Sequence, residues 1–228
     1  MNLLDAKKAL VLAAHPDDET LGVGGTIQRL VKNGCEVHVT FYTEGEEGFA
    51  DPRLKDDITK IRGEEIKMVQ KILGFQSFEF VGYKDMDVPN DKEALKRTIG
   101  VIRRVKPDVI FTHYHKDKHR DHRAISELSG EAWWQSGENV CADLGKPWKV
   151  KQLYEYEVLD LFQPTHILDI SEEFSNVCAA VRKYSSQMDV LPNVLKISEG
   201  IAMVRGGQIG VRYGEGLAEH FCIPTPLG

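Results

Sequence analysis

The sequence lacks the features that mark a secreted, membrane-spanning or nucleic-acid-binding protein. Its four cysteines, at positions 35, 141, 178 and 222, form no C-x-x-C pair, which argues against both a disulfide framework and a thiolate metal cluster. No apolar run approaches the ~20 residues needed to cross a bilayer, and no signal-peptide core precedes Lys7. The formal net charge of -6 argues against a general nucleic-acid binder, which needs a basic face. We therefore expect a cytoplasmic protein that neither spans a membrane nor binds nucleic acid.

A nucleotide-binding fingerprint is also missing. The stretch Leu21-Gly22-Val23-Gly24-Gly25-Thr26 is rich in glycine but does not match G-x-G-x-x-G. Glycine lets the backbone of a helix approach a sheet closely, so a packing role for these glycines is favoured over phosphate binding.

Apolar runs and amphipathic stretches alternate along most of the 228 residues. A run that is apolar throughout, such as 9–13, is typical of a parallel strand covered on both faces, whereas 57–73 shows the apolar spacing of a helix. The predicted strands are 9–13, 37–41, 78–81 and 109–111, with further ones within 153–161 and at 167–170. The predicted helices lie at 57–73 and 95–105, after residue 26, around 125–133 and around 174–184.

This alternation predicts an α/β fold with a Rossmann-like, open and mostly parallel sheet that has helices on both faces. The expected strand order is 3-2-1-4-5, in which strands 1 and 4 are neighbours. The length suits one domain, residues 1–228, in which the glycine- and proline-rich residues 190–228 form an irregular C-terminal part.

Two clusters of polar residues follow predicted strands 1 and 4. The first is His15-Pro16-Asp17-Asp18-Glu19, and the second, residues 113–122, holds four of the eight histidines together with two aspartates. Each has a simpler interpretation, as an acidic helix start and as a solvated His-rich loop. Because ligands bind at the carboxyl ends of parallel strands, however, the two clusters should converge on one crevice. We therefore predict a metal site at the carboxyl ends of strands 1 and 4.

The residue types suit metal-assisted hydrolysis of an amide. A catalytic zinc ion takes three protein ligands and keeps one position for water. His15 and Asp18 can face one ion, and one histidine of the second cluster would complete the set. The side chain of Asp17 diverges from that of Asp18, so Asp17 is free to act as a general base. A second histidine could donate a proton to the leaving group or stabilise the oxyanion, with a neighbouring carboxylate fixing its tautomer.

The paired motifs at 14–19 and 119–122 resemble the PIG-L/LmbE family of zinc-dependent N-deacetylases that act on N-acetylglucosaminyl compounds. The resemblance covers nearly the whole chain. It extends through Gly24-Gly25-Thr26, Thr43-Glu44-Gly45-Glu46-Glu47-Gly48, the Arg62/Glu65 pair, and Glu219 with Phe221.

The resemblance implies roles for single residues. The implied zinc ligands are His15, Asp18 and His122, although a site of two histidines and one aspartate also accepts Fe(II) or Co(II). Asp17 would be the base that activates water. His119 would polarise the carbonyl or protonate the amine, with Asp121 tuning it. We also expect three residues to contact the substrate: Arg62, Glu46 and Arg120. By helical spacing alone, Arg62 would be half of a surface ion pair with Glu65.

The expected function is that of a metal-dependent hydrolase which removes the N-acetyl group from a small-molecule amino-sugar conjugate. Arg62 and Arg120 suggest a polar or acidic substituent on the anomeric carbon of that sugar. Two departures from the family pattern bear on this substituent, because Arg120 stands where the family usually has proline and Tyr184 where it often has histidine. A deacylase for a non-sugar amide and a non-catalytic metal- or sugar-binding module are the alternatives. The sequence does not determine whether the protein forms a homo-oligomer. The other residues of the second cluster are expected only to support the site: His113, His115 and Asp117.

Overall fold

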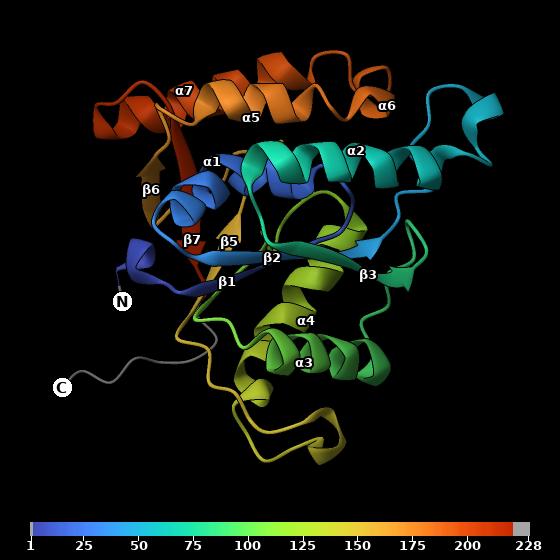
Figure 1. Cartoon of the computed structure of the whole chain (residues 1–228), viewed down its shortest axis with the longest axis vertical. Coiled ribbons are helices and arrows are strands. Elements are labelled where there is room, and N and C mark those ends of the chain that lie inside the picture. Colours follow the sequence, from blue (N-terminus) through green and yellow to red (C-terminus); the bar gives the residue numbers. More distant parts are fainter. Residues whose placement is uncertain (1, 221–228) are drawn as a thin grey trace.

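The computed structural model describes residues 2–220 of the chain, and the strands within them form one seven-stranded sheet (Figure 1). The strand order is β3-β2-β1-β4-β5-β7-β6. The strands from β1 to β5 pair in parallel, whereas β7 runs antiparallel to both β5 and β6. They are β1 Lys8–Ala13, β2 Glu36–Thr43, β3 Ser77–Tyr83, β4 Val109–His113, β5 Gln152–Tyr156, β6 His166–Asp169 and β7 Gly214–Glu219. The predicted Rossmann-like, mostly parallel sheet is confirmed.

Helices cover both faces of this sheet. Figure 1 shows α1, α2, α5, α6 and α7 on one face and α3 and α4 on the other. The helices are α1 Asp18–Lys32, α2 Ile58–Leu73, α3 Lys92–Val105, α4 Arg120–Ser136, α5 Phe174–Val181, α6 Ser185–Met188 and α7 Val194–Ile209. Short 3-10 turns lie at Leu3–Asp5, Pro52–Leu54 and Ala142–Leu144.

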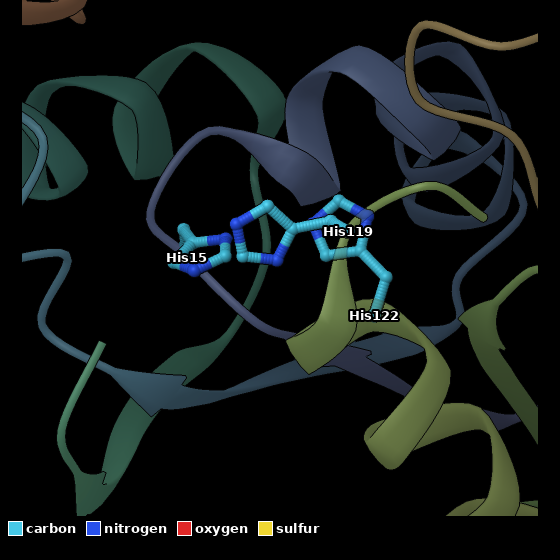
Figure 2. Close-up of side chains that lie close together, drawn as sticks. All are labelled: His15, His119 and His122. Carbon is cyan, nitrogen blue, oxygen red and sulfur yellow. The ribbon is translucent and has the colours of Figure 1, made fainter. Parts of the chain in front are cut away.

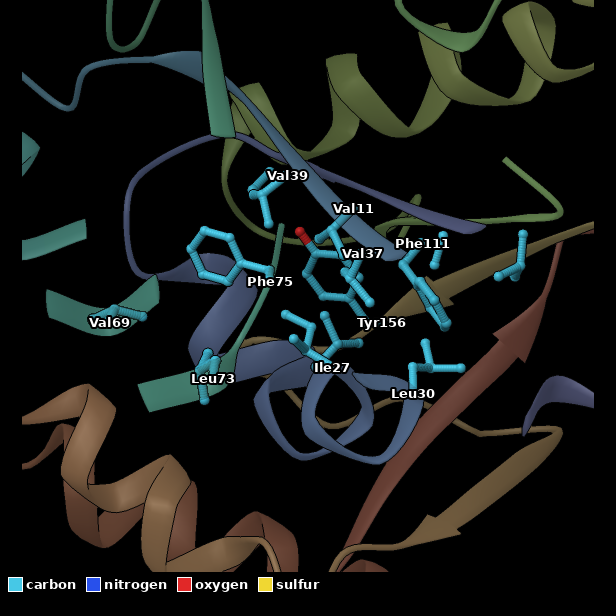
Figure 3. Close-up of a cluster of buried hydrophobic side chains, with 14 of the residues drawn as sticks. Val11, Ile27, Leu30, Val37, Val39, Val69, Leu73, Phe75, Phe111 and Tyr156 are labelled. Carbon is cyan, nitrogen blue, oxygen red and sulfur yellow. The ribbon is translucent and has the colours of Figure 1, made fainter. Parts of the chain in front are cut away.

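Strand β1 is the centre of the hydrophobic core, and its apolar residues are buried on both faces. Val11 belongs to the cluster that includes Ile27 and Leu30 of α1 (Figure 3). Leu10 and Leu12 belong to the opposite cluster, with residues of α3 and α4. Because both faces of β1 are covered, its polar continuation can begin only where the strand leaves the sheet, at its carboxyl end.

The prediction that residues 190–228 are irregular is wrong for much of that segment. It contains helix α7 and strand β7, while residues 221–228, with Cys222 and Phe221, lie outside the described part. Helix α7 could not be recognised in the sequence because its apolar residues and glycines do not follow an amphipathic helical period. A Cβ at Gly206 would lie 2.7 Å from the carbonyl of Arg212, so a glycine is needed there for the chain to turn back into β7. One domain spanning 1–228 stays a prediction.

The glycines of α1 serve close packing, as predicted. A Cβ at Gly22 would lie 2.3 Å from the ring of Tyr156, and one at Gly25 would lie 2.6 Å from Ile170. Helix α1 is kinked at Val23, and beyond the kink the buried carboxylate of Glu215 accepts the N–H groups of Gly25 and Thr26, both at 2.7 Å. Strand β7, which the sequence pattern did not reveal, therefore caps the helix that carries the first polar cluster.

Two expectations from the absent features can be compared with the structure. In the described residues, no helix combines the length and the apolar character that a membrane crossing requires. Cys35, Cys141 and Cys178 are free thiols.

The close approach of α1 to β5 can be tested by two matched glycine substitutions. Gly22→Ala should lower the free energy of unfolding by about 1–3 kcal/mol, because the new methyl group overlaps the ring of Tyr156. Gly63→Ala in α2, where a Cβ meets nothing within 4 Å, should instead raise it by about 0.5–1 kcal/mol. Urea unfolding measures both changes. A Gly22→Ala protein as stable as the wild type would show that α1 does not need this glycine.

Candidate metal centre

The two polar clusters meet because β1 and β4 are adjacent in the sheet. Ala9 of β1 is in register with Val109 of β4, so both strands end at the same edge. Just beyond that edge the backbone N–H of Ala14 donates to His113 Nε2 at 2.9 Å. The predicted convergence of the two segments is therefore confirmed.

The carboxylate of Asp18 lies between two imidazoles. Asp18 Oδ2 is 3.3 Å from His15 Nδ1, and Asp18 Oδ1 is 3.4 Å from His122 Nε2. Donor atoms bound to one tetrahedral zinc ion at the usual 2.0–2.1 Å are themselves about 3.3 Å apart. Figure 2 shows the rings of His15, His119 and His122 grouped at the end of β1 and the start of α4. Each of the two separations suits a divalent metal ion, but they involve different oxygens of Asp18, so one of these oxygens has to turn for all three residues to bind one ion.

The outer nitrogen of each imidazole faces a second carboxylate. His15 Nε2 lies 3.0 Å from Asp85 Oδ1, and His122 Nδ1 lies 3.2 Å from Asp117 Oδ2. Carboxylates in these positions hold the proton on the outer nitrogen and leave the inner nitrogen's lone pair for a metal. The position of Asp117 is consistent with the supporting role expected of it, and that role stays a prediction. Sequence reasoning missed the role of Asp85, although Asp85 follows the carboxyl end of β3 just as the two clusters follow β1 and β4.

Other side chains in the cluster could also provide ligands. Among the described residues, three groups bring one donor atom each within 4.8 Å of one another: His15/His119/His122, His15/Asp85/His119/Asp121 and Asp18/His113/His122. The predicted set of His15, Asp18 and His122 is not one of them, although each of its residues belongs to at least one group. His113 is fully buried and stacks on His122 with ring centroids 3.9 Å apart. Because His113 Nε2 already accepts the N–H of Ala14, that lone pair is not free for a metal. His113 is therefore expected to support the site by packing its ring against that of His122.

The charges at the centre favour a cation there. Burial opposes charging of His122, but the carboxylates of Asp18 and Asp117 outweigh it and raise the pKa of His122 to about 9. The pKa of His15 likewise lies well above its usual value, since Asp121, Asp18 and Asp85 together outweigh burial. These carboxylates make the buried pocket strongly negative, and a divalent ion would neutralise the same charge.

Asp17 adopts a strained backbone conformation, with φ 134°. Its N–H donates to Glu19 Oε2 at 3.1 Å, and the hydroxyl of Tyr184 donates to the other oxygen of Glu19 at 2.7 Å. Burial raises the pKa of Asp17 to about 7, and the Arg62 guanidinium, 3.5 Å away, partly opposes this rise. A carboxylate with a pKa near neutrality can take up a proton during a reaction. Tyr184 thus acts on Asp17 through Glu19.

A cavity of about 320 Å³ opens above the centre. Of the residues predicted for the site, six line it: His15, Asp17, Asp18, Arg62, His119 and His122. His119 also begins α4, where its Nδ1 accepts the N–H of Asp121 at 3.3 Å. Burial, together with His122 and His15, lowers the pKa of His119, so its imidazole is neutral and its Nε2 can serve the reaction.

The other three predicted residues do not line the cavity. Asp121 is fully buried, and its carboxylate accepts the N–H groups of Met86 and Val88 and lies 3.5 Å from His15. Its hydrogen bonds hold the 86–88 loop, and its charge acts to raise the pKa of His119 against the effect of burial, so the tuning of His119 by Asp121 stays a prediction. Glu46 accepts the N–H of Asp85 at 2.8 Å, and Arg120 is exposed at the start of α4.

Arg62 and Glu65 do not form the surface ion pair that helical spacing suggests, because both are buried. The guanidinium of Arg62 donates to the carbonyls of Gly45 and Pro16, and so joins the loops that follow β1 and β2. Glu65 accepts the N–H and hydroxyl of Ser186, which fastens α6 to α2. Arg62 reaches the cavity as the group that neutralises Asp17.

Comparison with known proteins identifies the family. The model of the PIG-L family, described as GlcNAc-PI de-N-acetylase, matches residues 10–133, more than half of the chain. The chain belongs to the PIG-L family.

Its relatives include several deacetylases. The diacetylchitobiose deacetylase of Thermococcus kodakarensis is 29% identical over 93% of this chain and 83% of its own length. The crystallised N,N'-diacetylchitobiose deacetylase of Pyrococcus horikoshii is 31% identical, with a TM-score of 0.89 over 98% of this PIG-L protein and 88% of that chain. The 1D-myo-inositol 2-acetamido-2-deoxy-alpha-D-glucopyranoside deacetylase of Rhodococcus jostii is 31% identical over 66% of this chain, which spans 61% of that relative's length.

The proteins similar to this PIG-L protein also include two that are named as hydratases. The 4-oxalmesaconate hydratase of Pseudomonas putida is 28% identical over 94% of this chain and 90% of its own length. The solved 4-carboxy-2-hydroxymuconate hydratase of that organism has a TM-score of 0.85 at 26% identity, over 96% of this chain and 98% of its own. Membership of the family therefore does not by itself determine the reaction.

The support that Asp85 gives to His15 predicts a measurable effect on metal binding. Asp85→Ala should weaken the affinity for Zn²⁺ about 10- to 100-fold, because the His15 imidazole loses the carboxylate that orients it. Asp87→Ala, at an exposed position of the same loop, is the control and should bind as the wild type does. Competition with a chromophoric chelator measures both affinities. Equal affinity in the two variants would contradict the role of Asp85.

Proposed function

We propose that this protein is a metal-dependent N-deacetylase that hydrolyses the acetamido group of an N-acetylglucosamine-containing conjugate. The observation that carries the proposal is the position of Asp17, a mostly buried carboxylate that lines the same cavity as His15, Asp18 and His122. A site that only bound metal or sugar would need neither this strained carboxylate nor the neutral His119. The deacetylase relatives support the same reaction and the same class of sugar.

His15, Asp18 and His122 are the proposed metal ligands, and the metal is proposed to be zinc. Two imidazoles and one carboxylate form a usual zinc ligand set that leaves a position open. The ion, when bound, supplies a Lewis acid that lowers the pKa of water and polarises the amide carbonyl. Fe(II) and Co(II) suit the same ligands.

Asp17 is proposed to move the proton, and His119 is proposed to stabilise the oxyanion. Asp17 takes a proton from water as the water oxygen attacks the amide carbon. The C–N bond then breaks, and Asp17 passes the proton it took from water to the departing nitrogen. His119, whose ring centroid lies 4.7 Å from that of His15 and 4.8 Å from that of His122, donates its Nε2–H to the oxyanion and stays neutral. Water and the amide thereby give acetate and a free amine, with no further reactant.

Hydration of a polyacid, as the names of the hydratase relatives suggest for those proteins, fits this cavity less well. Carboxylate substrates are usually held by arginine or lysine. In the described part of the chain, the cavity is lined by only two such residues, Arg62 and Lys118. Arg62 is bonded to backbone carbonyls and faces Asp17, and Lys118 donates to Asp160 at 3.0 Å. The contacts of Arg62, and the position of Arg120 outside the cavity lining, weaken the argument for an acidic substituent that these two residues suggested.

Acetate release from a panel of N-acetylglucosaminides tests the proposal. The zinc-loaded wild type should release acetate, and Asp17→Asn should keep the metal but lose about 10²–10⁴-fold in kcat/KM, because the base is gone while its shape remains. Asp56→Asn, at an exposed position, is the control. Wild-type turnover by metal-loaded Asp17→Asn would exclude Asp17 as the base. Hydration of an unsaturated polyacid without any acetate release would exclude the deacetylase itself.

A further inference from the structure

The cavity above the metal centre has an apolar wall for which the deacetylation step has no use. Its apolar lining comes from several separate segments: Leu21, Met86, Val158, Leu159, Val190 and Leu191. Leu21, Val158 and Leu159 belong to the hydrophobic core clusters or pack against them. Their presence in the lining follows from the fold.

The other three apolar residues have no such structural reason. Met86, Val190 and Leu191 are 50%, 38% and 37% exposed, and none belongs to a core cluster of the described residues. We call these three residues the apolar rim. Eleven large apolar side chains of the described residues are exposed, but only these three also line the cavity, so it is their shared position beside the site that points to a ligand contact.

Met86 in particular is held in place at a cost in backbone energy. Its φ of 65° lies in the left-handed region, which is unfavourable for a side chain of this size. The conformation is fixed because the N–H of Met86 donates to the fully buried carboxylate of Asp121 at 2.8 Å. Backbone strain of this kind persists where surrounding structure enforces it, and it gathers at ligand-binding sites. The fold therefore keeps an apolar side chain at the mouth of the cavity.

The charges around the mouth disfavour an anionic partner for this rim. Lys118 is paired with Asp160, and Arg62 is occupied by carbonyls and by Asp17. Glu47 also lines the cavity. A phosphate or carboxylate at the mouth would meet negative charge with no unpaired lysine or arginine of the described cavity lining to balance it.

We propose that the apolar rim binds an uncharged alkyl or aryl substituent carried on the anomeric carbon of the N-acetylglucosamine unit. This inference rests on the proposed deacetylase function. The acetamido carbonyl must reach the metal centre, whose side chains are buried at the floor of the cavity. The anomeric substituent extends away from that floor and meets the exposed residues of the rim. The rim contacts then select an apolar glycoside over the free sugar.

The test compares four substrates with the zinc-loaded full-length protein. They are free N-acetylglucosamine, octyl N-acetyl-β-D-glucosaminide, N-acetylglucosamine 1-phosphate and N-octanoylglucosamine. We expect kcat/KM for the octyl glycoside to exceed that for the free sugar about 10-fold or more, since apolar contacts of a few methylene groups contribute on this scale. The 1-phosphate should be no better than the free sugar.

Two substitutions in the rim, together with one control outside it, assign this preference to the rim. Met86→Gln and Leu191→Asn keep side-chain size but remove apolar surface, and each should raise KM for the octyl glycoside about 3- to 10-fold while leaving KM for free N-acetylglucosamine unchanged. Met203→Gln is the matched control, because Met203 is 57% exposed on α7 and does not line the cavity. Calorimetric binding of the octyl glycoside to metal-loaded Asp17→Asn, with and without Met86→Gln, gives the same comparison without turnover.

The outcomes separate this inference from the proposed function. Acetate release with equal efficiency on the free sugar and the octyl glycoside would overturn the apolar rim and leave the deacetylase intact. A preference for the 1-phosphate would overturn it as well. If N-octanoylglucosamine is the better substrate and the rim variants impair its cleavage, the rim binds the acyl chain and the inference is wrong. Failure to cleave any of the four sugars would overturn the proposed function, and with it this inference.

Discussion

The buried carboxylate of Asp18, between the imidazoles of His15 and His122, is the constraint on which the site depends. Burying a carboxylate costs several kcal/mol unless positive charge or hydrogen bonds compensate. Here the compensation comes from the two imidazoles and from the backbone N–H of His15, which donates to Asp18 at 2.8 Å. Each imidazole is in turn held by an outer carboxylate, Asp85 or Asp117. A divalent ion placed among these side chains would neutralise the negative charge of the Asp18, Asp85 and Asp117 carboxylates.

The fold supplies this arrangement through the neighbouring positions of β1 and β4. The chain leaves β1 through a tight turn in which Asp17 has a strained backbone, so that Asp18 can begin α1 while Asp17 turns its side chain toward Arg62. Glu19 and Tyr184 hold that turn from the side of α6. Tyr184 stands where the family often has histidine. Because Tyr184 is buried and bonded to Glu19, this change affects how the Asp17 backbone is held and not the surface that a substrate would contact.

The sequence was sufficient to predict the parallel half of the sheet and the meeting of its two polar clusters. Both depend on local signals, namely buried apolar runs and the polar residues that follow them. They depend also on the strand order that alternating strands and helices usually adopt. The C-terminal elements could not be predicted, because α7 is stabilised by packing of its small residues and β7 by strands on both sides. The hydrogen-bond partners of Arg62 and Asp121 likewise could not be predicted from the sequence. Arg62 is bonded to carbonyls of two loops, and Asp121 to the N–H groups of a third, and such contacts leave no periodicity in a sequence.

The position of the metal ion in crystals of the zinc-loaded protein tests the central claim most directly. Anomalous scattering at the zinc edge should give one peak per chain, at about 2.0–2.2 Å from His15 Nδ1, an oxygen of Asp18 and His122 Nε2. Asp85 and Asp117 should still face the outer nitrogens of the two imidazoles. A peak held by His113, or one held by His119, Asp85 and Asp121 away from Asp18, would contradict the account.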